Sequence, residues 1–259
     1  MREVDGGRDA RTGVLAGART HQLARLVGLV LAAFVLVEAL LLGLGLLVTR
    51  VLERSALARQ ELAFVRALED QRTPPWDDVT LVGSVLGSTV TVVVLTAVGC
   101  LLLAWRGQGP RLPAFLAVAV AGETGLFLLA SLVIDRLRPP IAQLDMAPPT
   151  SSFPSGHTAA TVALGIGLAL GLARTHPRHR LRALSWILAV AAAGFVLFSR
   201  LYRGMHWPTD VAASIVFTVA WLLLLRAILL RPDRDRAGTV VMEDGTPRQA
   251  HDGGSHPGS

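Results

Sequence analysis

Hydrophobic residues in this chain come in long blocks that carry almost no charge. A helix that crosses a hydrocarbon core of ~30 Å takes ~20 apolar residues, and six blocks approach or exceed that length. With flanking residues included, the blocks cover residues 26–48, 79–105, 112–134, 157–173, 183–200 and 209–230. The blocks lack the alternation typical of strands, and lipid requires every backbone polar group to be satisfied internally. The sequence therefore predicts an all-α fold, a polytopic membrane bundle of six transmembrane helices.

Composition supports a membrane protein. Of the 259 residues, 52% are hydrophobic and only 17% are charged, whereas soluble domains have about 25% charged residues. The formal charge of +6 could indicate binding to nucleic acid, but all 25 basic residues are arginines that lie between or beside the apolar blocks. We therefore expect the bilayer, and no nucleic acid, as a partner. The single Cys100 excludes a disulfide framework and a cysteine-based metal site.

The arginines also predict the orientation. Six spans place both termini on the same side, and with the termini inside, sixteen arginines lie in inner segments and nine in outer ones. Arginine in short loops marks the cytoplasmic face, so both termini are predicted to be cytoplasmic. Residues 1–25 and 231–259, rich in Gly, Arg, Asp or Pro, are predicted to be disordered tails around a membrane domain of residues 26–230. The long first block has no obvious cleavage site, which favours an uncleaved span over a signal peptide.

The first outer connection, residues 50–78, has apolar residues at helical intervals. Two interpretations stay open for it, a helix that lies in the membrane interface and a solvated helical connector.

Polar side chains that could bind a ligand or take part in catalysis gather in the other two outer connections. Ser155, Gly156 and His157 open the fourth predicted helix, where free N–H groups and the positive end of the helix dipole attract an anion. Glycine at such a point lets the backbone approach a ligand closely, and arginine forks match phosphate oxygens.

His206 and Asp210 lie four residues apart before the last span, with Pro208 between them as the expected first helical residue. At that spacing Asp210 can orient the imidazole and stabilise its positive form. A neutral histidine held in this way can act as a nucleophile, while a second histidine protonates the leaving group.

Taken together, these residues resemble the type 2 phosphatidic acid phosphatase family, the lipid phosphate phosphatases. The family pattern has three parts: Lys with Arg-Pro seven positions on, then Pro-Ser-Gly-His, then Ser-Arg followed by His and Asp. The second part is Pro154–His157, and the third is Ser199 and Arg200, five residues, His206, three residues and Asp210. The resemblance covers roughly the third to sixth spans.

The first part of the pattern departs from the family. Arg138-Pro139 is present, but the position seven residues before Arg138 is Ser131, and the chain contains no lysine. Arg136 is the nearest candidate for the missing positive charge. The soluble vanadium-dependent haloperoxidases resemble the same site, but six predicted spans favour a lipid substrate.

The resemblance implies a metal-independent phosphatase without a cofactor. His206 would attack phosphorus to form a phosphohistidine with support from Asp210, and His157 would protonate the leaving oxygen. The groups that would hold the phosphoryl oxygens are Arg138, Ser155, Gly156, Arg200 and, as the substitute for lysine, Arg136. We interpret Tyr202 and Arg203 as interfacial residues.

The expected substrate is a membrane lipid phosphate or pyrophosphate, with polyprenyl diphosphate, phosphatidate and phosphatidylglycerol phosphate all open. An extracytoplasmic site in a bacterial plasma membrane is expected, and the oligomeric state is open. The alternatives are a lipid phosphotransferase, a non-catalytic lipid-phosphate binder and a transporter, which would need more mid-membrane polar residues than Glu38 and Glu123. For these two residues, we favour interhelical roles over catalysis.

Overall fold

The structure is a computed structural model that describes residues 6–107, 109–146 and 150–230, with side chains described from residue 20 onward. The described residues form α-helices and one short 3₁₀ turn, η1 (Leu52–Arg54). The α-helices are α1 (Gly6–Arg50), α2 (Ala56–Asp70), α3 (Pro74–Leu86), α4 (Thr89–Trp105), α5 (Arg111–Val133), α6 (Gly156–Thr175), α7 (His179–Tyr202) and α8 (Pro208–Leu229). The prediction of an all-α fold is confirmed.

Five described helices, α1, α5, α6, α7 and α8, are each long and apolar enough to cross a membrane. Helices α3 and α4 pass the same test together, so the spans number six if this bent pair is one span. The chain is thus a multi-pass membrane protein, as the hydrophobic blocks predicted.

The predicted continuous span over residues 79–105 is broken in the structure. Helix α3 ends at Leu86, Gly87 and Ser88 follow, and α4 begins at Thr89 with its axis bent by 51° from that of α3. The Ser88 hydroxyl accepts a hydrogen bond from the backbone N–H of Thr91, and this cap starts a new helix. An apolar block without charge gave no sign of the break.

The N-terminal segment also differs from the expectation. Helix α1 begins at Gly6, so residues 6–25, which we expected to be disordered, are helical. The predicted disorder of residues 231–259 lies outside the described residues. The segment 50–78 contains α2, whose Glu61 and Val65 are buried; this amphipathic pattern agrees with both interpretations that the sequence left open.

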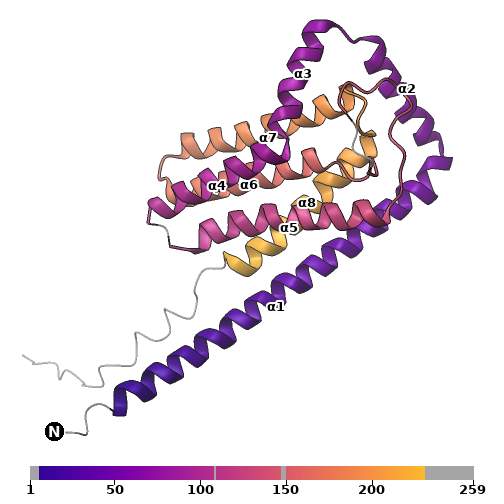
Figure 1. Ribbon diagram of the computed structural model, residues 1–259. Coiled ribbons are helices and arrows are strands. Elements are labelled where there is room, and N and C mark those ends of the chain that lie inside the picture. Colours follow the sequence, from indigo (N-terminus) through magenta and orange to yellow (C-terminus); the bar gives the residue numbers. More distant parts are fainter. Residues whose placement is uncertain (1–5, 108, 147–149, 231–259) are drawn as a thin grey trace, which may run out of the picture.

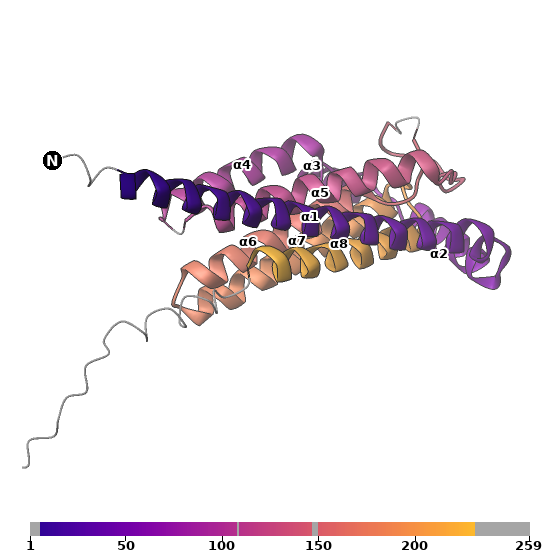
Figure 2. The same cartoon turned by 90° about the horizontal axis from the view of Figure 1, so that it is seen from below.

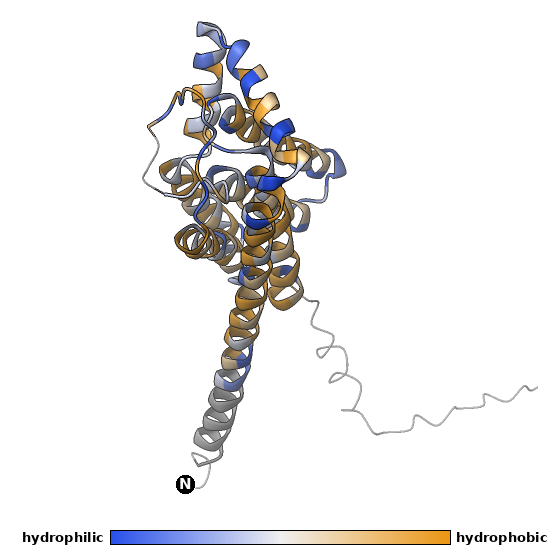
Figure 3. Cartoon of the chain, turned by 90° about the vertical axis from the view of Figure 1, so that its right-hand side faces the viewer, coloured by the Kyte–Doolittle hydropathy of each residue, from blue (hydrophilic) through white to orange (hydrophobic). Residues whose placement is uncertain are grey.

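Helices α4 to α8 lie side by side, and α1 crosses them obliquely in contact with α5 and α8 (Figures 1 and 2). The first part of α1 extends away from the bundle, toward the same end of the molecule as the last turn of α8 (Figure 1). The opposite end carries α2, α3 and the connections into α6 and α8. Hydrophilic residues gather at that end, whereas the helices of the bundle are mainly hydrophobic (Figure 3).

Helix α6 packs tightly in the middle of the bundle because several of its residues are small. A Cβ atom on Gly165 would lie 3.2 Å from the Cβ of Ala189 on α7, and one on Gly171 would lie 3.1 Å from Leu103 on α4. Without a hydrophobic drive between helices in lipid, such close backbone approach is a main source of packing energy. The central position of α6 fixes its N-terminal residues relative to α7 and α8.

Candidate active site

Three chain segments meet at the polar end of the bundle: the connection from α5 to α6, the first turn of α6, and the turn from α7 to α8. Gly204 makes the last turn possible, because its φ of +72° lies in the left-handed region and a Cβ there would approach the Ala142 carbonyl to 2.9 Å. The backbone N–H of Leu144 donates to the Arg203 carbonyl and that of Ser152 to the Arg136 carbonyl. These hydrogen bonds fix the connection from α5 to α6 against itself and against the turn from α7 to α8.

The His206 side chain is buried in the turn before α8, with 4% of the residue exposed. Its Nδ1 lies 2.7 Å from the carbonyl oxygen of Ser152. Because a carbonyl oxygen only accepts, Nδ1 carries the proton and Nε2 keeps its lone pair. Burial, together with the charges of Arg200 and Arg138, lowers the pKa of His206 well below its ordinary value of 6.5. The geometry therefore produces a neutral imidazole whose Nε2 keeps a free lone pair, which a nucleophile requires.

Asp210 supports His206 less directly than the sequence suggested. Its Oδ2 accepts the backbone N–H of Trp207 at 2.8 Å and lies 3.9 Å from Nδ1 of His206. The hydrogen bond that orients the ring thus comes from Ser152, while Asp210, fully buried in the first turn of α8, acts on the imidazole through its charge.

Arg136 faces carboxylates, which does not fit the phosphate-binding role that we expected. Its Nη1 donates to Asp210 and to the Thr209 hydroxyl, and its Nη2 donates to Glu61 on α2 at 3.2 Å. A third carboxylate, that of the half-exposed Glu53, lies 3.5 Å from Nε. Only 5% of Arg136 is exposed, so the guanidinium is occupied in holding Asp210 and anchoring α2.

Arg200 is buried at the end of α7 and bridges to a carboxylate that the motifs do not include. Its Nη1 donates to Asp145 and to the Ser84 hydroxyl, each at 2.6 Å. Asp145 also accepts from Arg203 at 2.8 Å. Burial raises the pKa of Asp145, but the Ser84 hydroxyl and the charges of Arg200 and Arg203 outweigh it and hold the pKa below its ordinary value. An ionised Asp145 therefore lies next to Arg200.

The remaining motif residues surround the start of α6. Arg138 is half-buried, and its Nη1 donates to the Met205 carbonyl at 2.6 Å, directly before His206. The Ser155 hydroxyl pairs with that of Thr158 at 3.0 Å, and Gly156 lies against the ring of Phe127, where a Cβ would approach to 3.1 Å. The free N–H groups of this first turn can receive an anion.

His157 points toward the break between α3 and α4. A Cβ atom on Gly87 would lie 3.1 Å from the Cβ of His157 and 3.3 Å from its Cδ2. The charges of His157, Arg138 and Arg200 all act on His206, so the structure brings both motif histidines into one electrostatic environment.

Some site residues escaped the sequence reasoning because they lie far away in the chain. Glu61 and Arg136 are separated by 75 positions, and Asp145 and Arg200 by 55. Their only signal was charge in segments next to the membrane. Tyr202 and Arg203, which we expected at the interface, are buried at 3% and 5% exposure. In the part of the chain that is described, no three His, Cys, Asp or Glu side chains are grouped to hold a metal ion.

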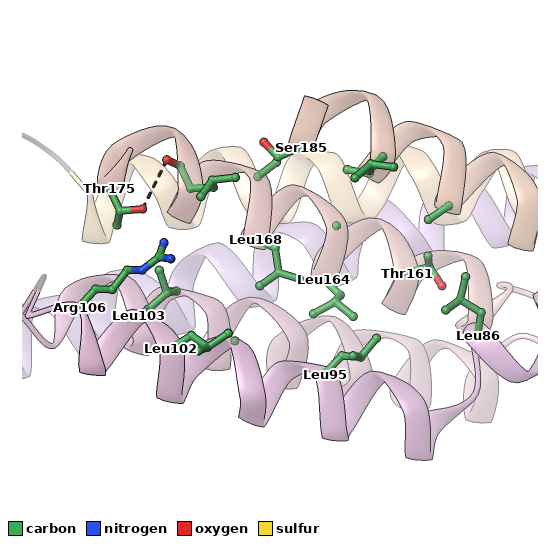
Figure 4. A pocket seen from close by; sticks show the side chains of 17 residues that line it. Leu86, Leu95, Leu102, Leu103, Arg106, Thr161, Leu164, Leu168, Thr175 and Ser185 are labelled. Carbon is green, nitrogen blue, oxygen red and sulfur yellow. Dashed lines mark hydrogen bonds between the residues drawn. The ribbon is translucent and has the colours of Figure 1, made fainter. Parts of the chain in front are cut away.

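An apolar cavity of about 480 Å³ lies between α4, α6 and α7. Leu95, Leu102, Leu103, Leu164 and Leu168 point into it (Figure 4). It begins near Leu86 and Thr161 and extends past Ser185 to Arg106 and Thr175 at the other end of these helices (Figure 4).

The sequence profile of the PAP2 superfamily matches residues 112–234, which include both histidines, Asp210, Arg138 and Arg200. Residues 112–234 thus belong to the PAP2 superfamily. The crystal structure of a transmembrane PAP2 type phosphatidylglycerolphosphate phosphatase from Bacillus subtilis has the same fold, with a TM-score of 0.68 and 21% identity over 78% of this chain and 98% of that one.

Two curated relatives are similar in sequence to this chain. An undecaprenyl-diphosphatase from Sulfolobus acidocaldarius is 36% identical over 42% of the chain, and phosphatidylglycerophosphatase B from Escherichia coli is 44% identical over 30%. The matches span 46% and 28% of those proteins, so the chain aligns with less than half of either relative.

Proposed function

We propose that this PAP2 chain is a membrane-embedded phosphatase that hydrolyses a lipid phosphate or diphosphate through a phosphohistidine at the extracytoplasmic face. The observation that carries the proposal is the state of His206. Its Nδ1 is tied to the Ser152 carbonyl, it is buried, and its lowered pKa keeps the ring neutral. Such an imidazole has one free lone pair, on Nε2, which suits it to act as a nucleophile.

In the first step, Nε2 of His206 forms a bond to phosphorus as the bond from phosphorus to the lipid oxygen breaks. His157 gives its proton to that oxygen. In the second step, His157 takes a proton from water as the water oxygen attacks the phosphohistidine, which releases phosphate and restores His206. Asp210 stabilises the positive charge that develops on the ring, and Arg136 holds Asp210 in place.

The phosphoryl oxygens would lie among Arg138, Arg200, the Ser155 hydroxyl and the Gly156 amide. Arginine donors in a buried site stabilise the charge of a phosphoryl transition state strongly, because they are already oriented. Nε of Arg200 is buried and has no hydrogen-bond partner among the described residues, so this guanidinium retains a donor for a phosphate oxygen. No step of this mechanism needs a metal ion.

The substrate range follows from the relatives' names and the bilayer position. Both curated relatives are named for phosphatases that act on lipids, an undecaprenyl diphosphate and a phosphatidylglycerophosphate. The arginine distribution supports cytoplasmic termini, which would place the polar end with the site outside a bacterial plasma membrane.

The test is phosphate release from lipid phosphates by the purified protein with a metal chelator present. His206→Ala should abolish release, whereas the matched control His179→Ala, an exposed histidine at the opposite end of α7, should keep the parental rate. Acid-labile phosphate bound to the parent protein and absent from His206→Ala would support the intermediate. Release that disappears with chelator, or that survives in His206→Ala, contradicts the proposal.

A further inference from the structure

We propose that the cavity between α4, α6 and α7 binds the hydrocarbon part of the substrate, and that it fits a single long chain of the polyprenyl type. This inference rests on the proposed phosphatase function and names the class of lipid for that site.

The walls of the cavity match a hydrocarbon chain. Apart from Arg106 and Thr175 at one end, Thr161 at the other and Ser185 between them, the lining side chains are apolar or glycine. Its volume of about 480 Å³ lies in the range of ~300–1,000 Å³ that small-molecule sites occupy. A chain in this space would contact leucines on α3, α4, α6 and α7 and the small residues of α6 and α7.

One end of the cavity lies beside the proposed acid. Thr161, which lines the cavity, donates its hydroxyl hydrogen bond to the His157 carbonyl at 2.8 Å, one turn of α6 away. Leu86, the lining residue at the end of α3, precedes Gly87, which lies against the His157 side chain. The cavity therefore starts on the side of α6 toward which His157 points.

The proposed reaction also requires the lipid chain to lie on the His157 side of the phosphate. The acid protonates the leaving oxygen, and that oxygen carries the lipid, either directly or through a second phosphate. The lipid must therefore depart past His157 and away from His206, because the nucleophile and the leaving group lie on opposite sides of phosphorus. The cavity continues in that direction from His157.

A second apolar cavity of about 310 Å³ fits this requirement less well. It lies between α6, α7 and α8 and is lined by Thr158, Val162, Trp186 and Ile215, among others. Thr158 is fully buried and hydrogen-bonded to Ser155, whereas the His157 side chain lies against Gly87, next to the first cavity. Only the first of these two cavities therefore begins on the His157 side.

The length of the first cavity favours one long chain. Along α6 it runs from Thr161 to Thr175, which corresponds to ~21 Å at ~1.5 Å per residue. Half of the hydrocarbon core, the depth of one leaflet, is only ~15 Å. A channel longer than a leaflet and leading from one side of His157 suits a polyprenyl chain better than the two shorter chains of a glycerolipid.

The experiment blocks the cavity at two depths and measures chain-length preference. Ala192→Phe fills it nearer to the Thr161 end and Ser185→Phe farther along α7, toward the Thr175 end, while Ala191→Phe adds the same ring to an exposed neighbour that does not line it. The substrates are polyprenyl phosphates of increasing length, a short soluble prenyl phosphate and a diacyl phosphatidate, all in one detergent.

In the parent, kcat/KM should rise with prenyl length and exceed that for phosphatidate. Ala192→Phe should lower kcat/KM for long chains about tenfold or more, since overfilling a packed space is strongly unfavourable, and leave the short substrate unchanged. Ser185→Phe should affect only the longest chains, and Ala191→Phe none. Equal use of all chain lengths, or equal effects of Ala191→Phe and Ala192→Phe, overturns the inference. Loss of the phosphatase itself would appear separately, as no release from the short substrate by the parent.

Discussion

Replacing Arg136 with methionine removes a buried positive charge that contacts Asp210 and Glu61 in the structure. The two carboxylates are 0% and 5% exposed as side chains, and Arg136 is 3% exposed. Glu53, the third carboxylate, is 45% exposed, so water screens it and its loss of a partner matters little. The perturbation therefore leaves two buried carboxylates without their cation.

The expected loss of stability is large. Removing one partner of a buried ion pair costs about 3–5 kcal/mol, because the remaining charge stays buried and uncompensated. For a domain of this size, 1 kcal/mol shifts Tm by about 2–4 °C, so Arg136→Met should lower Tm by roughly 6–20 °C. Arg59→Met, at an exposed position on α2, is the control and should change stability by no more than about 0.5 kcal/mol.

The assay combines thermal unfolding in detergent with steady-state phosphate release. Below its Tm, Arg136→Met should show a reduced kcat with little change of KM, because it misplaces Asp210 and not the substrate. Arg136→Lys, which keeps a charge but not the fork, should lie between the parent and the methionine variant. A raised KM with the Tm of the Arg59→Met control would refute this reasoning and show that Arg136 binds phosphate.

Three further predictions concern the proton and charge balance of the site. Because the pKa of His206 is lowered in the folded protein, the unfolded chain binds a proton on this residue more readily, and the folded state loses stability as pH falls below 6.5. The folded ring is still neutral at that pH, so kcat/KM should stay constant as pH falls through 6.5. A pH–rate profile with an acid midpoint at or above 6.5 contradicts this prediction. Asp145→Asn removes a negative charge beside Arg200 and should strengthen inhibition by inorganic phosphate about tenfold, unlike the exposed Asp135→Asn; unchanged inhibition would argue against it. His157→Gln should slow release from alkyl phosphates by about 10²–10⁴-fold but far less from p-nitrophenyl phosphate, whose leaving group needs no proton, and equal losses on both would exclude His157 as the acid.

Most of the fold followed from the sequence because long apolar blocks leave few options in lipid. The broken span did not, since the pattern over residues 79–105 is apolar on both sides of Gly87. The break depends on tertiary packing: a Cβ on Gly87 would meet Val196 at 2.8 Å and His157 at 3.1 Å. Packing of this kind joins residues that no local pattern connects.

The candidate site likewise contains residues that the sequence predicted and residues that it did not. The sequence predicted that His206, His157 and Asp210 would come together, because their types and spacing resemble one family pattern, and the structure places them at one end of the bundle; their catalytic roles stay predictions. Their partners could not be predicted. The carbonyl of Ser152 that holds His206 is a backbone group without a sequence signature, and Asp145 is one of many acidic residues in the outer connections. Arg136 matched the expected charge, but the nearby carboxylates determine what it binds.

The break between α3 and α4 separates a helix beside the polar end of the molecule from a helix of the apolar bundle. Removing a lipid chain from a membrane into water costs ~0.8 kcal/mol per CH₂, which no phosphate-binding site could offset for a long chain. Because His157 lies at the break and the apolar cavity continues beside α4, phosphate and chain can stay at the depths they already have in the leaflet. With the proposed function, the substrate would reach His206 by lateral diffusion within the membrane, and the rate of phosphate release would depend on the surface density of the substrate in the bilayer and not on its concentration in water.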